Sequence, residues 1–165
     1  MMNRLMRSAG VVLIACSLSA CAPPSPSSDS KDPAMSSVQE DAPYPADLEH
    51  LDEILALSDL GAIPEGATDI AVTPAVKFAE SYPTGWGYVV SYRADDEAIR
   101  RYVDDYTSHN SAIIDKYPAS LDEHNREDLG LTSIENPWVT TVGNTTLVFE
   151  RPLGRGWLQV LGSAR

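Results

Sequence analysis

The chain has 165 residues, of which 24 are acidic and 12 are basic, so its formal net charge at neutral pH is −12. Nucleic acid is an unfavourable partner, because affinity for a phosphate backbone depends on clustered Lys and Arg, and the basic residues here are scattered. Both cysteines, Cys16 and Cys21, lie near the N-terminus. The chain after Cys21 therefore has no internal disulfide, no cysteine nucleophile and no thiolate metal site.

The N-terminus has the composition of a secretory signal. Arg4 and Arg7 supply its positive charge. The apolar run that follows, residues 8–18, is shorter than the roughly 20 residues that span a bilayer. A permanent transmembrane helix is therefore not expected here.

The end of the apolar run, Leu18-Ser19-Ala20-Cys21, resembles the lipobox of bacterial lipoproteins. In that class, the cysteine receives a diacylglycerol thioether and signal peptidase II cleaves in front of it. The resemblance implies a signal peptide over residues 1–20 and a lipidated, palmitate-bearing Cys21 as the first mature residue. It also implies a membrane-anchored protein that faces outside the cytoplasm, in the cell membrane or, in a host with two membranes, the outer membrane. Two acyl chains make such an anchor stable.

A second cysteine also fits the lipobox pattern, in Leu13-Ile14-Ala15-Cys16. Cleavage before Cys16 would leave an apolar core of only about eight residues, at the low end for a signal. Cleavage before Cys21 uses the whole run, and the composition changes abruptly after it. The interpretation therefore favours Cys21, with Cys16 as the alternative.

Two regions are expected after the signal. Residues 21–45 comprise the lipidated cysteine and a segment rich in Pro, Ser, Ala and Asp, which indicates a disordered tether. Residues 46–165 have the length and apolar content of one folded domain.

The predicted elements of this domain alternate between helix and strand periodicity. Leucines three to four apart predict an amphipathic helix over 46–60, with Gly61 as its C-cap. Two-residue alternation predicts a strand over 70–78, at a sheet edge or bulged because of Pro74, and a second strand over 86–93. The second strand is expected to place its aromatic residues on one face: Trp86, Tyr88 and Tyr92.

The second half is expected to hold a helical region followed by three strands. Acidic residues followed by a buried stripe predict a helix from Asp95 to Tyr106, able to continue to Tyr117 unless residues 108–110 break it. A short polar helix is expected over 120–130. Gly143-Asn144 predicts a hairpin in which Trp138 faces Phe149 and Thr140 faces Leu147. The last strand is expected over 157–161. The order predicts an α+β fold: a mostly antiparallel sheet of about five strands with helices on one face.

No motif of a known chemistry occurs. His50 with Glu53 and His124 with Glu127 each offer two ligands at helical spacing, fewer than a catalytic zinc needs, so neither a metal nor a cofactor is predicted. The acidic pairs, such as Asp104-Asp105, are typical of a solvated face.

Aromatic residues provide the remaining functional lead. Tyr82 and Trp86 lie near the end of the first predicted hairpin, where an exposed aromatic surface is able to contact a ligand. The sequence thus favours a non-enzymatic binding or interaction module of the cell envelope, whose partner is an envelope protein or a small ligand. The alternative is an envelope hydrolase whose site is built from carboxylates and from His109 or His124. The oligomeric state is left open.

Overall fold

The structure is a computed structural model that describes residues 39–116, 123–130 and 136–164. Contacts within the chain set Pro33–Arg165 apart as one compact unit. The predicted signal peptide, Cys16 and Cys21 lie outside the described residues, as do most of the predicted tether and the start of the helix expected over 120–130. The elements, in chain order, are η1 (Leu48–His50), α1 (Leu51–Ala56), β1 (Thr68–Pro74), α2 (Val76–Ser81), β2 (Gly85–Arg93), α3 (Asp96–Tyr106), η2 (Ser111–Ile113), α4 (Glu123–Asp128), β3 (Trp138–Val142), β4 (Thr145–Phe149) and β5 (Arg155–Ser163).

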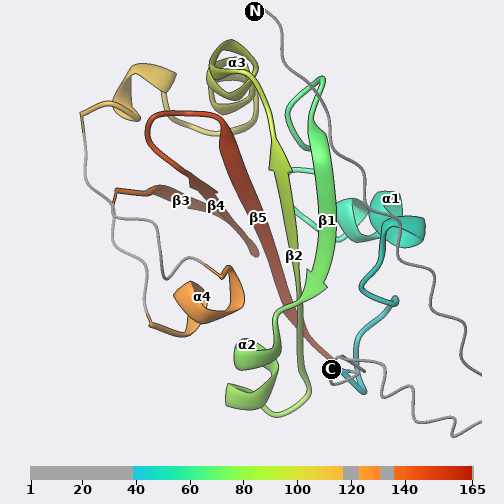
Figure 1. The fold of residues 1–165 in the computed structure, drawn as a ribbon. Coiled ribbons are helices and arrows are strands. Elements are labelled where there is room, and N and C mark those ends of the chain that lie inside the picture. The colour runs from blue at the N-terminus through green and yellow to red at the C-terminus, as the bar shows by residue number, and fades with distance from the viewer. Residues whose placement is uncertain (1–38, 117–122, 131–135, 165) are drawn as a thin grey trace, which may run out of the picture. The chain divides into compact units, whose positions relative to one another are not determined.

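The fold is α+β, as the element order predicted. Five strands form one antiparallel sheet in the order β1-β2-β5-β4-β3 (Figure 1). The predicted β3–β4 hairpin is confirmed, with Trp138 opposite Phe149 and Thr140 opposite Leu147. Gly143 adopts a positive φ of 55° in its loop, which a residue without a Cβ does at little cost.

Helices cover both faces of the sheet, not one as predicted. The first face buries the aromatic stripe of β2 together with Ile54 of α1 and Ile99 of α3. The second face buries a smaller cluster around Trp157 of β5, which includes Leu129, just after α4, and against which the half-buried Phe78 of α2 packs. Figure 1 shows α2 and α4 at one end of the sheet and α3 at the other. The sequence concealed this second layer because both helices in it are only six residues long, too short to show a clear helical period.

Two predicted elements are shorter than expected. The helix predicted over 46–60 spans only Leu48–Ala56, and Leu48 is exposed. The strand predicted over 70–78 ends at Pro74, and the chain then forms α2. The alternation of Val76 and Phe78 was therefore misread, because two apolar residues fit a short helix as well as a strand. The expected position of Pro74 on an edge strand is confirmed.

Helix α3 follows the prediction closely. Ile99, Tyr102 and Val103 are buried, whereas Tyr106 is 46% exposed at the end of the helix. The helix stops there because Thr107 is extended, and Asn110 then caps η2 through its side chain. The break predicted at residues 108–110 is therefore the one that occurs.

Candidate functional site

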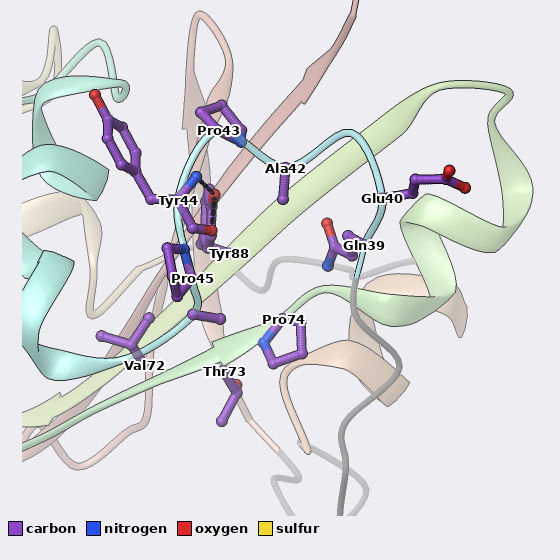
Figure 2. Close-up of a pocket in the computed structure, with 11 residues that line it drawn as sticks. Gln39, Glu40, Ala42, Pro43, Tyr44, Pro45, Val72, Thr73, Pro74 and Tyr88 are labelled. Carbon is purple, nitrogen blue, oxygen red and sulfur yellow. Dashed lines mark hydrogen bonds between the residues drawn. The ribbon is translucent and has the colours of Figure 1, made fainter.

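Residues 39–46, here called the strap, form an arch over one end of the sheet (Figure 2). Most of this segment was predicted to belong to the disordered tether, and the structure corrects that boundary. Composition pointed the wrong way because the strap has no large aliphatic side chain, and its hydrogen bonds go to residues far away in the sequence. Tyr44, the only aromatic residue in 21–45, was the one available signal.

The first attachment of the strap joins Gln39 to Gly87 of β2. The Gly87 N–H donates to Gln39 Oε1 at 2.6 Å, and Gln39 Nε2 donates to the Gly87 carbonyl at 2.9 Å. That carbonyl also accepts from the N–H of Ala75, where β1 leaves the sheet. The Gln39 amide therefore takes the place of a peptide group of an adjacent strand. It satisfies the N–H and the carbonyl of Gly87 in β2, next to the point where β1 ends.

The second attachment joins Tyr44 to Tyr88. The Tyr88 hydroxyl donates to the Tyr44 carbonyl at 2.7 Å and accepts from the Tyr44 N–H at 2.9 Å. Burial raises the pKa of this hydroxyl above its usual value, so it stays protonated at neutral pH. The Tyr88 hydroxyl thus holds both the N–H and the carbonyl of Tyr44 against the sheet.

A cavity of about 630 Å³ lies between the strap and β1. Its lining combines proline rings, tyrosines and small aliphatic side chains: Gln39, Glu40, Ala42, Pro43, Tyr44, Pro45, Ala46, Val72, Thr73, Pro74 and Tyr88. Figure 2 shows Ala42 pointing from the strap toward the sheet, while Glu40 points outward. The volume falls within the range of small-molecule sites in proteins.

The edge strand β1 forms one side of this cavity. The N–H of Ala75 donates to the Gly87 carbonyl, so Ala75 directs its backbone N–H toward β2. In an antiparallel ladder this direction alternates from residue to residue. The N–H and C=O groups of Thr73 therefore point toward β2, and the backbone groups of Val72 and Pro74 point away from it. Pro74 has no N–H to offer. A register shift between Thr68 and Ala71 interrupts the other end of the strand. The free edge is therefore short.

A smaller cavity of about 260 Å³ lies on the other side of Gln39, beside α2. Three of its lining residues are acidic: Glu40, Asp41 and Glu80. It is more polar than the cavity under the strap and less suited to an apolar ligand.

Tyr82 and Trp86, the residues predicted to contact a ligand, do not line either of these cavities. Tyr82 is 58% exposed and stacks on Phe78, with ring centroids 4.8 Å apart. Trp86 is half-buried against Tyr88 and Gly162. The structure thus gives each a separate aromatic or backbone partner and does not bring the two into one site.

The histidines weighed above for metal binding or for catalysis have other partners in the structure. His50 Nδ1 lies 2.7 Å from Asp47 Oδ1, and its ring stacks near Tyr44 of the strap. His109 Nε2 lies 3.0 Å from the Thr140 hydroxyl, and its ring packs edge-on against Trp138. Both histidines therefore fasten loops to neighbouring elements. The side chain of His124 lies outside the described residues.

Acidic residues that the sequence places on a solvated face also have structural roles. Both oxygens of Asp104 accept from Ser111, from its N–H and its hydroxyl. Both oxygens of Asp128 accept from the first backbone N–H groups of α2, those of Lys77 and Phe78. Within the described ranges, no three His, Cys, Asp or Glu side chains gather as a metal ligand set.

Among the residues that the structure describes, two buried polar side chains have no hydrogen-bond partner: the Tyr92 hydroxyl and the Gln159 amide. They lie on opposite faces, because Tyr92 shares the face of Tyr88, whereas Gln159 pairs with Val89 on the second face. Neither lines the cavity under the strap. Their unmet hydrogen-bonding capacity bears on stability.

Comparison with known proteins returned no match to a family model, a curated protein or a solved structure. No helix in the described part of the chain has the length and apolar character needed to cross a membrane.

Proposed function

We propose that this chain is a lipid-anchored, extracytoplasmic binding protein of the cell envelope. In this proposal Cys21 carries the lipid, and the cavity under the strap takes an envelope ligand. The protein then acts by binding rather than by catalysis. The cavity carries the proposal, because it combines a suitable volume with walls fixed by Gln39 and Tyr88.

The position of the cavity supports the proposal. The strap is the part of the fold that directly follows the segment leading back to the lipobox, and Gln39 follows Cys21 by 18 residues. A ligand held against the strap would therefore be held close to the end of the segment that leads to the anchor. The acidic character of the chain is consistent with attachment through the lipid, because anionic headgroups repel it.

The anchor is tested by metabolic labelling with an alkyne analogue of palmitate in the native host. We expect Cys21→Ala to abolish labelling and processing, and Cys16→Ala to leave the lipid in place. Label that survives Cys21→Ala and disappears with Cys16→Ala would move the anchor to the alternative cysteine.

The binding site is tested by photo-crosslinking in native membranes. A photoreactive residue at position 42, inside the cavity, is expected to capture an envelope component. The matched position is Ala71, which is exposed on β1 and outside the cavity lining. Equal capture at both positions, or capture at neither, contradicts the assignment of this cavity.

A further inference from the structure

We infer that the cavity under the strap selects a neutral, apolar ligand, either a hydrocarbon chain or an uncharged ring system. This inference rests on the proposed function, which makes the cavity a binding site, and adds the chemical class of the ligand. Three properties of the lining carry it: the use of its polar side chains, the short free edge of β1, and the charge of Glu40.

Two of the polar side chains that line the cavity, those of Gln39 and Tyr88, already use their hydrogen-bonding atoms within the protein. Gln39 uses its amide oxygen and nitrogen on Gly87, and the Tyr88 hydroxyl both donates to and accepts from Tyr44. A sugar brings many hydroxyl groups that lose water on entry and need new partners. Since these side chains cannot supply partners without releasing the strap, a polar ligand would lose free energy on burial.

The free edge of β1 offers little to an extended peptide. Pairing with a new strand requires a row of outward N–H and C=O groups. Of the outward residues, Pro74 provides only a carbonyl, and the register shift before Ala71 interrupts the row, so Val72 alone offers both groups in regular geometry. That is enough for one polar end of a ligand, not for a strand.

The charge at the rim disfavours anions. Glu40 carries the one formal charge among the lining residues, and the chain as a whole carries −12. An anionic amphiphile would therefore bind less well than a neutral molecule of the same shape. The rest of the lining is largely apolar, with rigid rings from Pro43, Pro45 and Pro74 that lose little entropy when a ligand packs on them.

The test uses residues 22–165, which contain the whole compact unit and avoid the detergent that the anchor requires. Two fluorescent probes share one ring system: phenylnaphthylamine is neutral, and anilinonaphthalene sulfonate adds a negative charge. We expect saturable binding of the neutral probe with higher affinity than the anionic one. Competition by a monoacylglycerol or by a neutral aromatic compound then distinguishes a chain from a ring as the natural occupant.

Three variants locate the binding. Ala42→Phe fills the cavity and is expected to weaken the neutral probe by about tenfold or more, since small volume changes in an apolar pocket have effects of that size. Ala71→Phe adds the same side chain outside the cavity and should leave binding unchanged. Glu40→Gln is expected to strengthen the anionic probe by about two- to fivefold, as for an exposed charge, with little effect on the neutral one. A thermal melt of each variant confirms its folding.

The outcomes separate the two claims. Preference for the anionic probe, or equal loss with Ala42→Phe and Ala71→Phe, overturns the inferred ligand class. If no apolar probe binds while position 42 still captures a polar envelope component, the ligand class is wrong and the proposed function stands. If neither probe nor envelope component binds at position 42, both are wrong.

Discussion

The side-chain amide of Gln39 occupies the place of a peptide group beside Gly87, 48 positions away in the chain. Position 87 itself requires a glycine, because a Cβ there would lie 2.7 Å from Leu161 Cδ2 and 2.9 Å from Ala75 Cβ. The absence of a side chain lets Ala75 and β5 pack closely against β2 at the point where the strap is attached. The strap is thereby part of the domain.

Removing the amide should weaken the domain. Gln39→Ala leaves the Gly87 N–H without its acceptor, and we expect a loss of about 1 to 2 kcal/mol in the free energy of unfolding, because a part-buried donor left unpaired costs about that much. Urea unfolding measures it. The control is Glu40→Ala, whose side chain is exposed in the same segment. Equal stabilities of the two variants would show that the Gln39 contact is not formed in solution.

The length of the domain gives a second prediction. A form spanning residues 39–165 should unfold cooperatively and be more stable than one spanning 46–165, by roughly 2 kcal/mol or more, since the shorter form loses the hydrogen bonds at both ends of the strap. Parallel urea titrations make the comparison. Indistinguishable midpoints and slopes would place the domain boundary back at residue 46.

Two buried tyrosines on one face should respond oppositely to loss of the hydroxyl. Tyr88→Phe removes both bonds to Tyr44 and should cost about 1 to 2 kcal/mol. Tyr92→Phe removes a fully buried hydroxyl without a partner, whose pKa burial raises well above its usual value, and should be neutral or stabilising. Tyr82→Phe, at an exposed position, is the control. A clear loss of stability in Tyr92→Phe would reveal a partner for that hydroxyl.

The His50–Asp47 pair predicts a dependence of stability on pH. The hydrogen bond to Asp47 raises the pKa of His50 above 6.5, and the hydrogen bond to His50 lowers the pKa of Asp47 below 3.8. The His50 contribution is therefore complete below pH 6.5 and is lost as pH rises through its folded-state pKa. The Asp47 contribution is complete above pH 3.8 and is lost as pH falls through its folded-state pKa.

The difference in unfolding free energy between wild type and His50→Gln should consequently be largest between pH 3.8 and 6.5 and decrease on both sides. Denaturant titrations across pH measure it. Asp47→Asn tests whether the two residues act as a pair. When position 47 is Asn, the effect of His50→Gln on the unfolding free energy should no longer vary with pH in this way. A difference that stays constant with pH would contradict the ionic contribution of the pair.

Local patterns determined much of the fold. The β3–β4 hairpin could be predicted with its register because Gly143-Asn144 encodes a two-residue loop and the flanking residues alternate. The same holds for α3, whose acidic start and buried stripe lie within eleven residues. The resemblance of residues 18–21 to a lipobox is also a local pattern, so the interpretation of Cys21 as an anchor depends on sequence alone.

Only the tertiary structure decided which residues build the candidate site. The sequence of the strap predicts a tether, because the strap is attached to residues 44 and 48 positions away and has no helical or strand periodicity of its own. The predicted ligand contact at Tyr82 and Trp86 likewise required the fold to bring the two side chains together. In the structure Tyr82 stacks on Phe78 and Trp86 packs against Tyr88 instead. Local sequence encodes backbone preference over a few residues, whereas a cavity forms where distant segments meet, and that depends on packing of the whole domain.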